Sequence, residues 1–167
     1  MVPYDMKKST IAFWSITVGL ALGGCGQSGS SSGSSTGASN GPLEVDLTAN
    51  DLMRYNQTSI EAAPGQELKV VFTNIGSTPK EAMAHNWVLL KKGSDPLAFS
   101  QAAISAKDTD YIPPSLKDEI IALIPLQGPH QSGEVDFKAP TEPGDYPFLC
   151  SFPAHYQVGM HGVLTVK

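Results

Sequence analysis

Three side chains near the C-terminus could bind one metal ion, because Cys150, His155 and Met160 follow one another at intervals of five residues in CSFPAHYQVGMHGVLTVK. A thiolate and a weak thioether, together with two imidazoles, form the donor set of copper sites that transfer electrons. His85 lies in a separate, largely apolar run, MAHNWVLL, and is the candidate for the second imidazole. The sequence therefore predicts a copper site assembled from two distant segments.

The use of cysteine supports metal binding. The chain has two cysteines, Cys25 and Cys150. Exported proteins usually pair cysteines in disulfides, but Cys150 loses its only possible partner if Cys25 carries a lipid. Cys150 could instead be a buried bystander thiol or a catalytic nucleophile with His155 as its base. No protease-like motif surrounds Cys150, which makes the nucleophile the weaker alternative.

The first 41 residues predict an export signal, an anchor and a tether. Residues 1–24 contain Lys7 and Lys8 followed by the apolar stretch IAFWSITVGLALGG, which is short for a membrane span and typical of a signal peptide. The stretch ends in LGGC, which resembles a bacterial lipobox with Cys25 as the lipid-attachment residue. An uncleaved signal anchor is the alternative. Both place the protein on the extracytoplasmic side of the cytoplasmic membrane.

Residues 25–41 form the expected tether, which starts at Cys25. After Cys25 its residues are small and uncharged. Such a composition is typical of a flexible linker, and sixteen residues would have a root-mean-square reach of roughly 20–24 Å. The folded domain is therefore expected to occupy residues 42–167.

Apolar and polar residues alternate through much of this domain, as in Leu43, Val45 and Leu47 and again in Leu68, Val70 and Phe72. Period-two patterns of this kind predict half-buried strands. About seven or eight of them, separated by turn residues, indicate an all-β, Greek-key β-sandwich. One helical insertion is expected at residues 96–106, where Asp95 can cap it, followed by an irregular segment at 108–115 and a strand at about 119–126.

Charge and histidine content exclude several classes of protein. The formal charge is −5 and Lys and Arg form no cluster, which argues against nucleic-acid binding. His130 and His161 are expected at the surface. A copper nitrite reductase needs a second, histidine-rich copper site and two domains, and this chain is too short and too poor in histidine for both.

Several of these motifs resemble the azurin and auracyanin families of blue copper proteins, within the cupredoxin fold. The segment 83–89, MAHNWVL, and the loop 150–155, CSFPAH, are very similar to the azurin segments around the first histidine ligand and the cysteine. Further likeness runs through most of residues 43–167. Four residues separate His155 from Met160, as in auracyanin, whereas azurin has three. The azurin disulfide has no counterpart among the two cysteines of this chain.

The resemblance implies a role for each residue of the site. His85 and His155 would bind one type 1 copper ion through Nδ1, Cys150 through Sγ and Met160 as a long axial ligand. Ala84, Asn86, Ser151 and Phe152 would surround the ligands, with amide N–H groups of Asn86 and Phe152 directed at the sulfur. The residues expected to form an apolar docking surface around His155 are Met53, Met83, Pro153 and Ala154.

The resemblance also implies a function without catalysis. A membrane-tethered monomer would carry single electrons between redox proteins, from a quinol-oxidising membrane complex to a cytochrome c or a photosynthetic reaction centre. The main alternative is a periplasmic copper carrier or storage protein. A structural zinc protein is a third possibility, because the same donors can hold zinc.

Overall fold

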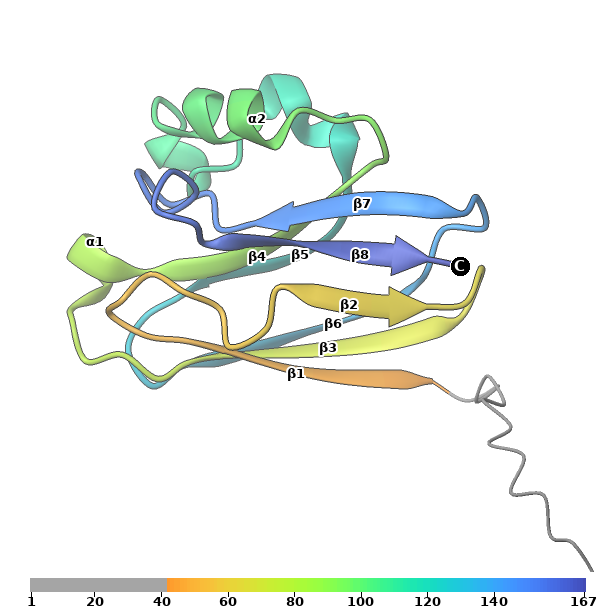
Figure 1. The fold of residues 1–167 in the computed structure, drawn as a ribbon. Coiled ribbons are helices and arrows are strands. Elements are labelled where there is room, and N and C mark those ends of the chain that lie inside the picture. Colours follow the sequence, from red (N-terminus) through yellow and green to blue (C-terminus); the bar gives the residue numbers. More distant parts are fainter. Residues whose placement is uncertain (1–41) are drawn as a thin grey trace, which may run out of the picture. The chain divides into compact units, whose positions relative to one another are not determined.

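The computed structural model describes residues 42–167, which form two facing β-sheets (Figure 1). The first sheet has the order β1-β3-β6, and the second has the order β2-β8-β7-β4-β5. The strands of the first sheet are β1 (Leu43–Ala49), β3 (Glu67–Asn74) and β6 (Ser132–Lys138). Those of the second are β2 (Ser59–Ala62), β8 (His161–Val166), β7 (Gly144–Leu149), β4 (His85–Leu90) and β5 (Ile120–Gln127). The all-β sandwich predicted from the sequence is confirmed.

Alternation along the strands builds the core between the sheets. In β3, Leu68, Val70 and Phe72 are buried, whereas the residues between them are partly exposed. β1 runs parallel to β3 with Val45 opposite Val70, and β6 runs antiparallel to it. Burial of each such side chain stabilises the folded state by about 1.5–3 kcal/mol. The alternation of apolar and polar residues therefore determines which face of each strand points into the core.

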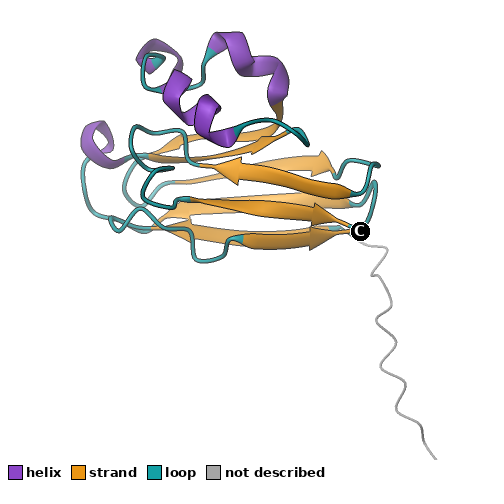
Figure 2. Ribbon diagram, turned by 45° about the horizontal axis from the view of Figure 1, so that its top comes forward, coloured by secondary structure: helices purple, strands orange, loops and turns teal. Residues whose placement is uncertain are grey.

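β4 departs from this alternation, because all six of its residues are buried. One face of β4 meets the opposite sheet, and the other lies under α2 (Pro96–Ala103), where Val88 and Leu90 pack with Phe99 and Leu149. Figure 2 shows α2 and the short helices that follow it gathered over one side of the sandwich, with one separate helical turn at an end. A strand that is covered on both faces has a nearly continuous apolar sequence, which explains why MAHNWVLL shows little alternation.

The helical insertion begins as predicted and ends earlier. Asp95 Oδ1 accepts hydrogen bonds from the N–H groups of Leu97 and Ala98, at 2.9 and 3.1 Å, and Pro96 occupies the first turn. The helix was expected to reach residue 106 but ends at Ala103, because the following amides bond three residues back, as Ala106 does to Ala103.

Three shorter helical elements were not predicted. These are α1 (Lys80–Met83) and the 3₁₀ helices η1 (Lys107–Thr109) and η2 (Pro114–Glu119), the last two bordering or replacing the expected irregular segment. The next strand, expected at about 119–126, is β5 at Ile120–Gln127. Among residues 42–167, no helix is both long and apolar enough to cross a membrane.

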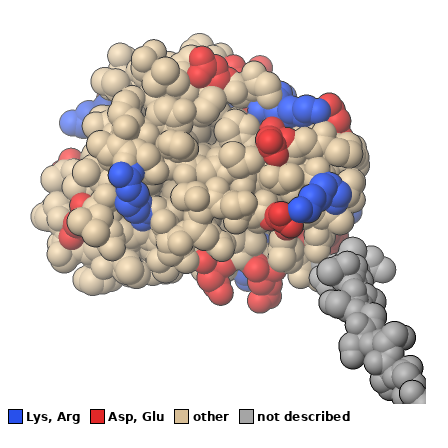
Figure 3. Space-filling model, viewed as in Figure 1, with Lys and Arg blue, Asp and Glu red and all other residues tan. Residues whose placement is uncertain are grey.

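The two ends of the sandwich differ in what they carry. The start of β1 and the end of β8 lie at one end, whereas the start of β4, the end of β7 and the start of β8 meet at the other (Figure 1). On the face drawn in Figure 3, Lys and Arg are interspersed with Asp and Glu. The expected signal peptide 1–24, Cys25 and the tether 25–41 lie outside the described residues.

Candidate metal centre

Three potential metal ligands converge at the end of the sandwich where β4 starts and β7 ends. His85 is the first residue of β4, Cys150 directly follows β7, and His155 lies in the loop to β8. Nδ1 of His85 is 3.1 Å from Nδ1 of His155, which is 3.4 Å from Sγ of Cys150. Metal–nitrogen bonds of about 2.0 Å and metal–sulfur bonds of about 2.3 Å, as zinc sites have, would fit both separations around one ion. All three side chains are buried.

Met160 joins these residues through the backbone of the loop. The N–H of Cys150 donates to the carbonyl of Met160 at 3.1 Å, and the N–H of Met160 donates to the carbonyl of His155 at 2.9 Å. Gly159, between them, has φ +100, a conformation that side chains disfavour. Met160 is fully buried, and His161 after it is exposed, as its position in the alternation predicted.

Burial sets the protonation of the three groups. It raises the pKa of the Cys150 thiol to about 12, against the opposing effect of N–H groups from Asn86 and Phe152. Burial, with a smaller contribution from the nearby His85, lowers the pKa of His155 to about 3. Burial also lowers the pKa of His85. At neutral pH both imidazoles are therefore uncharged and can offer a lone pair, and a bound cation has to displace only the thiol proton.

Asn86 ties the two ligand segments together. Its Nδ2 donates to Oγ of Ser151 at 2.7 Å, and its Oδ1 accepts from the N–H of Ser151 at 2.8 Å. Both bonds are buried and join the residue after His85 to the residue after Cys150. Buried hydrogen bonds of this kind keep the ligand positions fixed without help from a metal.

The described residues also match a model of the copper binding proteins of the plastocyanin/azurin family, over residues 42–167. The chain belongs to the plastocyanin/azurin family of copper binding proteins. Copper is the cofactor, and the cysteine, the two histidines and Met160 are positioned as in a type 1 copper site.

Named members of the plastocyanin/azurin family are similar across most of the domain. The chain is 34% identical to Auracyanin-B of Chloroflexus aurantiacus over 119 residues, which is 71% of this chain and 49% of that protein. It is 32% identical to azurin of Pseudomonas aeruginosa over 126 residues, 74% of this chain and 84% of that one. The structure of dithionite-reduced auracyanin from Roseiflexus castenholzii superposes with a TM-score of 0.67 at 33% identity, covering 76% of this chain and 98% of that one. The match thus spans about half the length of the first of these relatives.

The expected docking residues lie on loops, except for Met83 at the end of α1, and they differ in exposure. Met53, Met83 and Pro153 are partly exposed and Ala154 is exposed, whereas Ala84 is fully buried. His155 itself is only 2% exposed, so its ring lies just beneath the surface, packed against Phe152 with ring centroids 4.8 Å apart. The ring of His155 is therefore covered by its neighbours and does not protrude through the surface.

Sequence reasoning missed two apolar residues on the same loops. Leu52, next to Met53, is 74% exposed, and Val158, between His155 and Met160, is 39% exposed. Leu52 is next to Met53 and Val158 lies between His155 and Met160, so their positions in the sequence could have indicated that they belong to this surface. Both enlarge the apolar surface that surrounds the donors.

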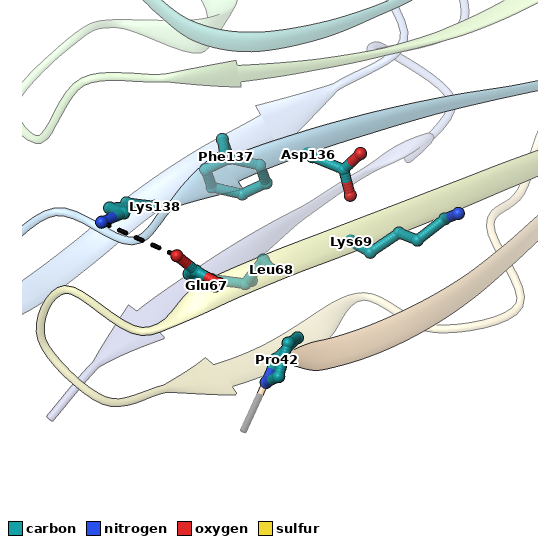
Figure 4. A pocket seen from close by; sticks show the side chains of 7 residues that line it. All are labelled: Pro42, Glu67, Leu68, Lys69, Asp136, Phe137 and Lys138. Carbon is teal, nitrogen blue, oxygen red and sulfur yellow. Dashed lines mark ion pairs between the residues drawn. The ribbon is translucent and has the colours of Figure 1, made fainter. Parts of the chain in front are cut away.

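A groove of about 410 Å³ lies away from these donors. Its walls come from β3 and β6 near Pro42 (Figure 4). Glu67 and Lys138 form an exposed ion pair across the two strands at 3.7 Å, and Lys69 and Asp136 are further charged residues of its lining. Exposed ion pairs of this kind contribute little to the stability of the fold. Among residues 42–167, no group of three or more potential metal ligands lines this groove.

Proposed function

We propose that this chain is a type 1 blue copper protein that carries single electrons at the extracytoplasmic face of a membrane. The ligands would be Nδ1 of His85, Sγ of Cys150, Nδ1 of His155 and the thioether of Met160. The observation that carries this proposal is the convergence of three buried donors, with Nδ1···Nδ1 at 3.1 Å and Sγ···Nδ1 at 3.4 Å, in a chain of a copper-binding family.

Copper, when bound, supplies the one-electron couple, and the protein supplies a site that need not rearrange. The Asn86 and Ser151 hydrogen bonds hold the two ligand segments at a fixed separation. Burial keeps water away from Cys150 and keeps both imidazoles neutral. A donor set held in one arrangement for both oxidation states leaves little nuclear motion to oppose transfer.

Electrons would pass through His155 to a partner docked on the surrounding loops. Met53, Met83, Pro153 and Ala154, with Leu52 and Val158, offer an apolar surface. Charged residues border it: Arg54 lies against Gly159, and Lys80, Glu81, Lys107 and Asp110 lie around Phe152. Methionine side chains adapt to different partners, and small apolar interfaces release quickly. These properties suit a carrier that must leave each partner after one electron.

The proposed setting is the membrane surface. Residues 1–24 would direct export, Cys25 would carry the lipid, and 25–41 would link it to the domain. The proposed partners are a quinol-oxidising complex as donor and a cytochrome c or photosynthetic reaction centre as acceptor; the similar auracyanin of Roseiflexus castenholzii comes from a photosynthetic bacterium. The protein would transform no substrate and would act as a monomer.

A copper carrier or store and a zinc protein are the competing functions, and reversible redox cycling separates them from an electron carrier. Residues 41–167 would be loaded with Cu(II), reduced with ascorbate and reoxidised with ferricyanide while the visible spectrum is recorded. An electron carrier gives an intense blue band that bleaches and returns over repeated cycles. Cys150→Ser is the control and should give no blue band, because the band requires the thiolate. A colourless protein that retains Cu(I) or Zn would overturn the proposal.

A further inference from the structure

A buried tyrosine reaches the metal centre from the segment after β1. Tyr55 pairs with Ala49 in an isolated antiparallel bridge, and the next residue, Asn56, donates its N–H to the carbonyl of Thr48 at 3.0 Å. The side chain is 6% exposed, and its ring packs edge-on against Phe72 and Phe148 with centroid separations of 5.9 and 5.7 Å. Both rings belong to the core, so the position of the Tyr55 hydroxyl is fixed by packing.

The hydroxyl of Tyr55 donates a buried hydrogen bond of 2.6 Å to the backbone carbonyl of Asn86. At this point the pairing of β4 with β5 is irregular, because His85 lies opposite Gln127 whereas Trp87 lies opposite Ile124. The tyrosine hydroxyl thus gives a buried backbone carbonyl its hydrogen-bond donor, next to the point where the pairing of β4 with β5 is irregular.

Asn86 is the residue through which this bond can act on the metal centre. Its side chain makes both bonds to Ser151, and its backbone N–H, with that of Phe152, interacts with the Cys150 sulfur. Hydrogen bonds to a ligating sulfur tune the potential of a metal site. A change in the orientation of Asn86 would therefore reach the sulfur directly and the cysteine loop through Ser151.

We propose that Tyr55 is a positioning residue for the copper centre, whose hydroxyl holds Asn86 so that its N–H and side chain keep Cys150 and its loop in place. This inference rests on the proposed function. The Tyr55 hydroxyl bonds to Asn86 and acts on the donors through that residue. Burial, with a smaller effect from Cys150, raises the pKa of Tyr55 well above its usual value, so the hydroxyl keeps its proton and remains a donor.

The test compares Tyr55→Phe with Tyr146→Phe in the copper-loaded full chain. Tyr146 is a matched control, because it is 3% exposed and its hydroxyl also donates to a backbone carbonyl, that of Glu142, at 2.7 Å. Each substitution removes one hydroxyl and one bond to a carbonyl, and the bond of Tyr55 is buried whereas that of Tyr146 is partly buried. Thermal unfolding of both variants measures the structural effect, so that a change in the potential can be separated from a loss of stability.

The copper potential should distinguish the two variants. A loosened N–H···S bond stabilises the electron-rich reduced centre less, so Tyr55→Phe should lower the potential. We expect at least a threefold change in the ratio of Cu(I) to Cu(II) affinity, or about 28 mV at 59 mV per tenfold change. The visible band should shift, and the Ser151 amide of the metal-free protein should exchange its hydrogen at least threefold faster. Tyr146→Phe should change none of these quantities.

Two results would have different meanings. A blue wild-type protein whose Tyr55→Phe and Tyr146→Phe variants have equal potentials and equal Ser151 exchange rates would overturn the positioning role and leave the electron carrier standing. A wild-type protein that forms no blue centre would remove the proposed function. In that case, unchanged exchange at Ser151 in Tyr55→Phe would also overturn the positioning role.

Discussion

At the scale of single residues, the thioether of Met160 is the proposed ligand with the weakest bond to copper. Met160→Leu keeps a similar volume in a fully buried position, so the fold should lose less than about 1.5 kcal/mol. Loss of a donor disfavours Cu(II) more than Cu(I), and the potential should rise by about 59 mV or more, a tenfold change in relative affinity, while the blue band remains. Voltammetry and the visible spectrum measure both effects. Complete loss of copper binding would contradict a weak axial role.

Protonation of His155 should make the metal-free protein sensitive to acid. The pKa of this imidazole is about 3 in the folded chain, against 6.5 for an ordinary histidine. Between these values the unfolded chain binds more protons, so the free energy of unfolding falls as the pH drops from 6.5 towards 3. Thermal unfolding of the metal-free protein at several pH values tests this.

The control for the acid experiment is His155→Asn. Carboxylates also contribute to acid unfolding, so the informative quantity is the difference in slope between the two proteins. His155→Asn should lose less stability per pH unit below 6.5 than the wild type does. Equal slopes would show that His155 is not the group responsible.

The donors could be found from sequence because copper requires particular atoms, and few residue types provide them. Cys150, His155 and Met160 are close in sequence, and His85 is prominent in an apolar run. Tyr55 could not be found in this way, because its contact with Asn86 spans 31 residues and depends on the irregular pairing of β4. A tyrosine in a strand-rich sequence is otherwise expected simply to fill the core.

At the scale of elements, α2 depends on its first turn. Asp95 Oδ1 accepts from two backbone N–H groups that have no partner within the helix. Asp95→Ala should lower the free energy of unfolding by about 0.5–2 kcal/mol, whereas Asp95→Asn retains an acceptor and should cost less than about 0.5 kcal/mol. Denaturant unfolding measures both, and equal losses would exclude capping as the cause.

The strands were predictable where one face met the core and the other met water, as for Leu68, Val70 and Phe72. β2 is harder to predict because it has only four residues, of which two, Ile60 and Ala62, are buried. The end of α2 was predicted wrongly for another reason. The segment SAKDT contains no residue that must end a helix, and the tightened turn after Ala103 depends on local hydrogen bonds. Periodicity locates an element better than it locates its ends.

At the scale of the whole domain, the start of the described chain and the proposed docking surface lie at opposite ends of the sandwich. Leu43 opens β1 at one end, whereas His85 and Cys150 lie at the other (Figure 1). A tether attached before Pro42 would therefore hold the domain by the end remote from the metal centre. The loops around His155 would stay accessible to partners, and the link would not need to be cut for electron transfer.

The attachment itself is tested by Cys25→Ser in the full chain, expressed in a bacterium that processes lipoproteins. If Cys25 carries the lipid, the wild-type protein should begin at an acylated Cys25 and the variant should lack this modification, because no other residue of the LGGC segment can form the thioether. Its blue band and potential should equal those of the wild type, since the described chain starts at the end of the sandwich remote from His85 and Cys150. Fractionation, mass spectrometry of the N-terminus and the visible spectrum give the three readouts. A wild-type protein with an intact N-terminus and no lipid on Cys25 would favour an uncleaved signal anchor, in which the apolar stretch 11–24 holds the protein.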